Sequence, residues 1–165
     1  MTEFPDWVRQ IDMAPHPEGG YFLETYRAEQ TLLTPRGERP ASTAILFLIT
    51  EGSVSHLHRL ASDELWVYQG GEPLELVTIA PDGALLRRVL GDLEGEGLLP
   101  QALVHAGCWQ GARLAGGPHL PAERAWALVS CVVTPGFDFS DFELGERDAL
   151  LAAYPQHGAL IEQLT

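Results

Sequence analysis

Short segments with the period of β-strands recur along this chain, and they restrict its fold more than any other feature. Glycine, proline and aspartate separate these segments, for example at residues 81–83 and 116–118. Regularly spaced short strands with such turns are typical of a β-sandwich or β-barrel, and no interior segment has the long helical period of a βαβ unit. The predicted strands are residues 21–26, 44–50, 64–68, 74–79, 85–90, 102–104, 109–114 and 125–133.

Helical spacing is confined to the two ends of the chain. Residues 4–13 predict a short N-terminal helix, and residues 146–154 and 157–164 predict two C-terminal helices. A length of 165 residues predicts one domain, 1–165, with a barrel core at about residues 21–139 and a helical tail at 140–165. We expect the tail to pack on the outside of the barrel or against a partner subunit.

Charge and apolar content argue against several kinds of partner. The chain has 10 basic and 23 acidic residues and a formal net charge of −13. It lacks the basic patch that nucleic acids and anionic membranes require, and its apolar runs are too short to span a bilayer. The N-terminus shows no signal peptide, and Cys108 and Cys131 form no disulfide framework, so we expect a cytoplasmic protein.

Two histidines and an acid form the most informative group of residues. His56 and His58 are two apart, so both side chains point to one face of a strand. Glu64 follows after a five-residue gap and opens the next strand, although Asp63 fits the spacing as well. Two imidazoles and a carboxylate suit a divalent Fe, Mn, Ni or Zn ion. An H-x-H pair alone is weak evidence, because a histidine on a strand is more often structural.

The strand that begins at Glu64 carries two aromatic residues on the same face as the acid. Trp66 either lines a ligand pocket or belongs to the core, and the two interpretations have equal weight. Tyr68 either donates a proton to a substrate or bonds a neighbouring group.

Several segments resemble cupin sequences. Residues 52–70 resemble the first cupin motif, in which an H-x-H pair, an acid and a glycine follow one another. Residues 105–110 resemble the second motif, with Gln110 where cupins usually place a third histidine. The whole chain resembles the small, single-domain cupin-five branch of the RmlC-like superfamily, which has no assigned function. The segments that carry this resemblance are residues 16–27, 58–66, 107–113 and 135–143.

This resemblance implies the double-stranded β-helix of cupins, a jelly-roll barrel that is commonly dimeric, so we expect a homodimer. It also implies that the loop with His16, Glu18 and Tyr21 edges a small-molecule pocket, and the alternative is a loop that only positions the first strand. From the residues themselves, we expect Phe137, Phe139 and Phe142 to form an aromatic group that seals the barrel mouth or docks the C-terminal helix. Gln110 extends the implied metal ligand set of His56, His58 and Glu64, although an amide oxygen is a poor ligand for softer metals.

The cupin fold alone does not decide function. One hypothesis is a metal-assisted isomerase or oxygenase acting through His56, His58 and Glu64 on a small polar metabolite. A second is a metal-free, epimerase-like enzyme with His58 as base and Tyr68 as acid. A third is a non-catalytic module that binds a small molecule.

Overall fold

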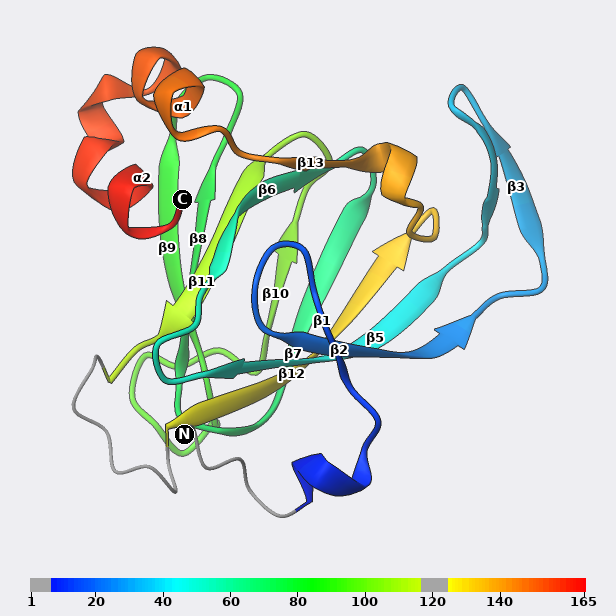
Figure 1. Ribbon diagram of the computed structural model, residues 1–165, viewed down its shortest axis with the longest axis horizontal. Helices are drawn as coiled ribbons and strands as arrows, with labels where there is room; N and C mark the ends of the chain where they lie inside the picture. The colour runs from blue at the N-terminus through cyan, green and yellow to red at the C-terminus, as the bar shows by residue number, and fades with distance from the viewer. Residues whose placement is uncertain (1–6, 117–124) are drawn as a thin grey trace.

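Two antiparallel sheets face each other in the computed structural model, which describes residues 7–116 and 125–165 (Figure 1). Within these residues the larger sheet has the order β1-β2-β5-β12-β7-β10, and the smaller has the order β13-β6-β11-β8-β9. The strands of the larger sheet are β1 (Ala14–Pro15), β2 (Tyr21–Arg27), β5 (Thr43–Thr50), β12 (Trp126–Thr134), β7 (Asp63–Gly71) and β10 (Gln101–Val104). Those of the smaller sheet are β13 (Phe142–Leu144), β6 (Ser55–Leu60), β11 (Trp109–Leu114), β8 (Leu74–Ile79) and β9 (Leu85–Leu90). The predicted all-β class is confirmed.

The remaining elements lie at the ends of the chain and beside the barrel. They are the hairpin strands β3 (Thr31–Thr34) and β4 (Gly37–Pro40), the 3-10 turns η1 (Val8–Gln10), η3 (Phe139–Asp141) and η4 (Pro155–His157), and the helices α1 (Arg147–Ala153) and α2 (Gly158–Gln163). No helix in the described ranges is both long and apolar enough to cross a membrane.

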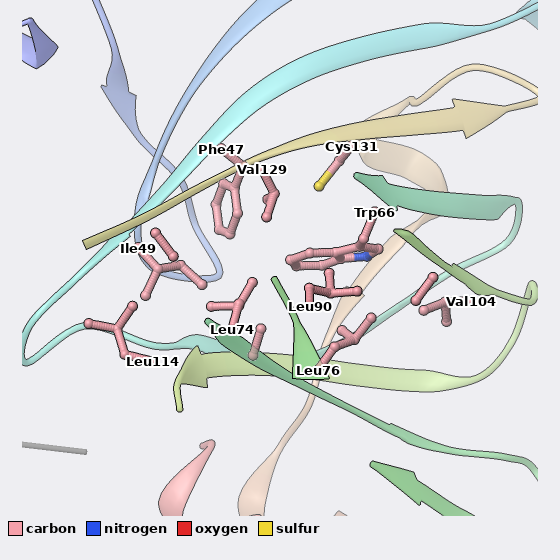
Figure 2. Packing of buried hydrophobic residues seen from close by; sticks show 13 residues of the cluster. Phe47, Ile49, Trp66, Leu74, Leu76, Leu90, Val104, Leu114, Val129 and Cys131 are labelled. Atoms are coloured by element: carbon pink, nitrogen blue, oxygen red, sulfur yellow. The ribbon is translucent and has the colours of Figure 1, made fainter. Parts of the chain in front are cut away.

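The main core lies between the sheets and is built from alternate residues of their strands. Figure 2 shows Trp66 within this cluster, with Phe47 and Val129 beside it and Leu74 and Leu76 on the other side. The buried members are Phe47, Ile49, Trp66, Leu74, Leu76, Leu90, Ala102, Val104, Ala112, Leu114, Ala127, Val129 and Cys131.

The C-terminal helices cover the outer face of the five-stranded sheet (Figure 1). Leu160 and Ile161 of α2 pack there against Leu57 of β6. Because neighbouring residues of a strand point to opposite faces, burying Leu57 under the helices turns His58 toward the barrel interior. Of the two predicted positions for the tail, the outside of the barrel is the one observed.

The predicted N-terminal helix is wrong over most of its described length. After η1 the backbone is extended at Ile11, and the chain then forms β1, which pairs with β2. Pairing with a neighbouring strand satisfies the backbone groups of this short segment better than a further helical turn does. The first three residues of the prediction, 4–6, lie outside the described residues.

Candidate functional site

A cavity of about 180 Å³ lies inside the barrel, against β2, β6, β7 and β12. A cavity of this volume holds several water molecules, so it admits a small molecule. Its lining combines buried titratable groups with aromatic side chains. The lining residues are His16, Glu18, Phe22, Glu24, Arg27, Thr43, Ile45, His58, Leu60, Glu64, Cys131, Val133, Phe137, Asp138 and Phe139.

The loop between β1 and β2 holds Glu18 inside the barrel. Gly19 has a φ of +100°, which favours glycine, and a Cβ atom there would lie 2.2 Å from the Val54 carbonyl oxygen. The Glu18 carbonyl accepts hydrogen bonds from the backbone N–H and from Nδ1 of His56, both at 2.7 Å. His56 therefore fastens this loop to β6.

The Glu18 carboxyl is the centre of a buried hydrogen-bonded cluster. Its Oε1 accepts a bond from the Ser55 hydroxyl at 2.9 Å. Its Oε2 lies 3.2 Å from His58 Nε2 and 3.3 Å from His16 Nδ1. One carboxyl thus connects two imidazoles of the cavity wall.

Hydrogen bonds fix where the imidazole protons lie. His58 Nδ1 is 2.8 Å from the His56 carbonyl oxygen, which only accepts, so Nδ1 carries a proton. In the neutral ring, Nε2 then presents its lone pair to Glu18. His16 Nδ1 accepts from the Glu18 backbone N–H at 3.3 Å and so carries no proton. Since both ring nitrogens that face Glu18 are acceptors, the carboxyl supplies the proton between them.

Burial favours the same neutral arrangement. It raises the pKa of Glu18 to about 8, against the Ser55 hydrogen bond, which lowers it. Burial lowers the pKa of His16 to about 4, with a further contribution from the charge of His58, and burial also lowers the pKa of His58. The carboxyl–imidazole contacts have the distances of ion pairs, but near neutral pH they are hydrogen bonds between uncharged groups.

Glu64 faces the same cavity from β7 and is held by a second chain of hydrogen bonds. Its Oε2 accepts from Gln110 Nε2 at 2.5 Å, and Gln110 Oε1 accepts from Trp66 Nε1 at 3.0 Å. The Cys131 thiol lines the same cavity and interacts with this carboxyl. Both ends of the Gln110 amide are therefore used in orienting Glu64.

The charge of Glu64 changes close to neutral pH. Burial raises its pKa to about 7, the charge of His58 lowers the pKa, and the charge of Glu18 raises it. Two carboxyls with raised pKa values thus share one cavity with His58, and near neutral pH the cluster contains both a proton donor and a proton acceptor.

Aromatic rings surround the outer part of the cavity. The ring centroid of Phe22 lies 4.8 Å from that of His16, and the Phe137 centroid lies 6.4 Å from it. Phe139 stacks on His16 at 6.3 Å with an interplanar angle of 25° and is 57 % exposed. These rings form an apolar entrance to the titratable groups.

Arg27 also lines the cavity, and its charge is neutralised there. Its guanidinium donates to both carboxylate oxygens of Glu24, at 2.9 and 2.6 Å, and to the Phe137 carbonyl at 3.3 Å. Asp138 contributes a further negative charge to this side of the cavity.

Five of the residues predicted from the sequence meet in this cavity. They are His16, Glu18, His58, Glu64 and Phe137. Of the two acids that the sequence left open, Glu64 is the one that lines the cavity. Asp63 instead accepts the Ala106 backbone N–H at 2.8 Å on the outside.

Other predicted residues lie elsewhere. Trp66 belongs to the core, so of its two interpretations the structural one holds, apart from its bond to Gln110. Tyr68 does not line the cavity and donates its hydroxyl to the Gly71 carbonyl at 2.6 Å, beside a β-bulge in β7. Tyr21 is half-buried and does not line the cavity either.

The four predicted metal ligands are not brought together. His56 does not line the cavity and uses Nδ1 on the Glu18 carbonyl. The carbonyl oxygen of Gln110 is occupied by Trp66. Within residues 7–116 and 125–165, no three His, Cys, Asp or Glu side chains are arranged to hold a metal ion. The donor set therefore does not fit a metal centre built on His56, His58, Glu64 and Gln110.

Sequence reasoning missed the cavity roles of Cys131 and Glu24. The run at residues 125–133 predicts a buried strand, and alternation along it places Cys131 inward, but no local pattern in the sequence indicates that β12 lies next to β7. Glu24 alternates with Phe22 on β2, and this alternation was available in the sequence.

Comparisons with known proteins place the chain among cupins. Residues 5–145 match the family model Cupin_5, described as "Cupin superfamily (DUF985)". The chain is 29 % identical to the uncharacterized protein YML079W of Saccharomyces cerevisiae, over 96 % of this chain and 86 % of that protein. The predicted resemblance is confirmed.

Two solved structures are similar over nearly the full length. A hypothetical protein from Leishmania major is 38 % identical with a TM-score of 0.88, covering 96 % of both chains. Protein SO0799 from Shewanella oneidensis is 39 % identical with a TM-score of 0.84, covering 97 % of this chain and 95 % of that one. Oxalate decarboxylase of Bacillus subtilis shares the fold at 13 % identity and a TM-score of 0.55, with 93 % of this chain covering 38 % of it. The predicted cupin barrel is thereby confirmed.

Proposed function

This chain belongs to the Cupin_5 (DUF985) family of the cupin superfamily, and on that premise we propose that it is an acid–base enzyme acting on a small polar metabolite inside the barrel. Glu64 is the proposed base and Glu18 the proposed acid, and His58 holds the Glu18 proton in place. The proposal keeps the metal-free chemistry of the second sequence hypothesis but changes both roles. Glu64 replaces His58 as the base, and Glu18 replaces Tyr68 as the acid.

The pairing of two buried carboxyls around His58 carries this proposal. Burial raises the pKa of both carboxyls, that of Glu64 to about 7 and that of Glu18 to about 8. The two acceptor nitrogens that face Glu18 favour its protonated form, so Glu18 is the donor of the pair and Glu64 the acceptor. An enzyme that moves protons at neutral pH needs such a pair, with one group able to accept and the other able to donate.

The proposed reaction is transfer of a proton within a bound carbonyl compound. The Glu64 carboxylate takes a proton from a C–H bond beside the carbonyl, and the Glu18 carboxyl gives its proton to the carbonyl oxygen. The resulting enol carries no net added charge, because one proton has left the substrate and one has arrived. The Ser55 hydroxyl, 2.9 Å from Glu18 Oε1, stabilises the carboxylate that remains. Reverse transfers to the other carbon or the other face give an isomer or epimer.

The alternative of metal-assisted chemistry has less support from the donor groups. It needs His56 and Gln110 beside His58 and Glu64, whereas the imidazole of His56 fastens the β1–β2 loop and Gln110 orients Glu64.

Hydrogen exchange in D2O tests the proposal without a known substrate. The probes are 2-oxo acids, aldoses, ketoses and amino acids, and NMR measures conversion of C–H to C–D. We expect the protein to accelerate exchange in at least one probe, and Glu64→Gln to slow it by about 100-fold or more. The matched control Glu94→Gln removes an exposed acid outside the cavity and leaves the rate unchanged.

Two outcomes contradict the proposal. Exchange that stops after chelation indicates metal-assisted chemistry. Absence of exchange in every probe, together with tight binding of one of them, indicates a binding module.

A further inference from the structure

We propose that the cavity selects small organic cations, molecules that carry a protonated amine or a quaternary ammonium group. This inference names the substrate class of the site and so rests on the function proposed above.

The fixed charges around the cavity favour a cation. Among the described lining residues, Arg27 is the one guanidinium, and it shares its charge with Glu24 through two hydrogen bonds at 2.9 and 2.6 Å. Asp138 also lies near the Arg39 guanidinium. Glu64 is therefore the lining carboxylate that no guanidinium of the described residues offsets, even when Glu18 holds its proton. An anion entering the cavity would meet this carboxylate and would have to displace Glu24 from Arg27.

The imidazole of His16 does not offset this charge. Its Nδ1 accepts the Glu18 backbone N–H at 3.3 Å, so that nitrogen has no proton and the ring is neutral. A neutral ring stacked on Phe139 adds to the aromatic wall and attracts no anion.

The aromatic wall supplies the second half of a cation site. Phe22, Phe137 and Phe139 line the cavity and pack around His16, with ring centroids 4.8 to 6.4 Å from it. The negative face of an aromatic ring attracts an ammonium group without needing a hydrogen bond, and aromatic walls are the usual means of recognising quaternary ammonium.

A buried carboxylate completes the site, because a cation leaves water only where a counter-charge replaces its hydration. Glu64 is 6 % exposed and supplies this charge at the inner end. An ammonium group also acidifies the C–H bonds beside it, which suits the abstraction of a proton by Glu64.

Three molecules of nearly the same shape test the charge preference. Choline is the cation, 3,3-dimethyl-1-butanol its neutral counterpart and 3,3-dimethylbutanoate the anion, and their affinities for the full chain are measured by NMR titration near neutral pH. We expect choline to bind at least tenfold more tightly than either of the others. Phe139→Leu should weaken choline binding several-fold and leave the binding of the neutral alcohol unchanged, since leucine preserves apolar contact but has no ring. Glu94→Gln should leave all three affinities unchanged.

Equal affinity for choline and the alcohol, tighter binding of the anion, or no binding of choline overturns the cation proposal. The hydrogen-exchange assay separates this failure from failure of the proposed function. If a neutral probe exchanges hydrogen but choline does not bind, the proposed acid–base function is supported and the cation preference is wrong. Selective choline binding without exchange in any probe, ammonium compounds included, supports the cation preference and contradicts the proposed acid–base function.

Discussion

Glu18 is the residue on which the chemistry of the cavity most depends, because it connects groups that are distant in the sequence. Its carboxyl contacts Ser55, His58 and His16, while its carbonyl accepts hydrogen bonds from the backbone N–H and from Nδ1 of His56. A buried acid in such surroundings keeps its proton, so Glu18 is a hydrogen-bond donor at a pH where an exposed glutamate is a charged acceptor.

Replacing Glu18 with glutamine is expected to change how stability depends on pH. The folded protein holds the Glu18 proton up to a pKa of about 8, whereas an unfolded chain releases it near 4.5. Raising the pH between these values therefore lowers the free energy of unfolding, by about 3–5 kcal/mol at 1.36 kcal/mol per pKa unit. Glu18→Gln removes this loss, so the variant should gain stability relative to the wild type from about pH 5 to about pH 9. Urea denaturation across this range measures the difference, and parallel curves for the two proteins would refute the assigned protonation state.

The pH dependence of hydrogen exchange follows from the same pair of carboxyls. Exchange needs Glu64 ionised, which holds above about 7, and Glu18 protonated, which holds below about 8. We expect a narrow, bell-shaped profile whose two limbs belong to the coupled pair. Glu18→Gln should slow hydrogen exchange, and the pH profile of its residual rate should have no alkaline limb. A profile that stays bell-shaped in this variant assigns the acid role to another group.

At the scale of elements, the β1–β2 loop places half of the acid–base cluster, and glycine makes this possible. Gly19 at φ +100° lies where a side chain would meet the Val54 carbonyl, so the loop backbone rests directly on the chain that leads into β6. Close contact between these two backbones brings the Glu18 carboxyl within 3.2 Å of His58.

Substitutions at two glycines with positive φ separate the cost of backbone strain from the cost of losing this close contact. Gly52 has a φ of +73°, and a Cβ added to it would meet no atom within 4 Å, whereas a Cβ on Gly19 would meet Val54 at 2.2 Å. Gly52→Ala should cost about 1–2 kcal/mol of unfolding free energy from the left-handed conformation alone. Gly19→Ala should cost about 3 kcal/mol or more and reduce hydrogen exchange, because the loop must move away from β6. Denaturation and exchange assays on both variants check this, and equal losses would mean that the contact does not position Glu18.

The elements also show which parts of the site were predictable. Alternation along the strand after Glu64 correctly turns Glu64 and Trp66 inward. Of the two interpretations of the Tyr68 hydroxyl, the bond to a neighbouring group is the one observed. Its partner, the Gly71 carbonyl, lies beyond a bulge that no local sequence pattern encodes. The spacing of His56 and His58 predicts that both side chains share one face of β6. It does not predict how far the cavity extends along that face, because this depends on where the β1–β2 loop crosses β6.

At the scale of the whole molecule, the barrel order was accessible through resemblance more than through local pattern. Turn residues and short strands predict an all-β domain, but they do not reveal that β12 lies between β5 and β7, which brings Cys131 to Glu64. The hairpin β3–β4 was not predicted at all. Its short sequence mixes prolines, charges and two leucines, and its strands pair with each other and not with either barrel sheet.

The same hairpin carries the most specific argument for the expected homodimer. It extends away from the barrel in Figure 1, with Leu33 91 % exposed at its surface. An isolated two-stranded hairpin is marginally stable in water, and an exposed leucine on strands with a free edge favours contact with another chain. Its base is held by Arg39, which donates to Asp141 at 2.8 and 3.0 Å, so a contact on the hairpin lies beside the η3 turn that carries Phe139 at the cavity entrance.

Leu33→Asp is therefore expected to convert a dimer into a monomer, because it places a charge in the proposed contact. Leu93→Asp is the matched control, since Leu93 is 74 % exposed on a different part of the surface and undergoes the same chemical change. Light scattering coupled to size exclusion measures the mass of each protein, with the wild type and Leu93→Asp expected as dimers. If the wild type is a monomer, the expected homodimer is wrong. If Leu33→Asp is still a dimer, the dimer interface does not include the hairpin. If the monomeric variant also binds choline more weakly, then the second copy supports the cavity entrance through η3.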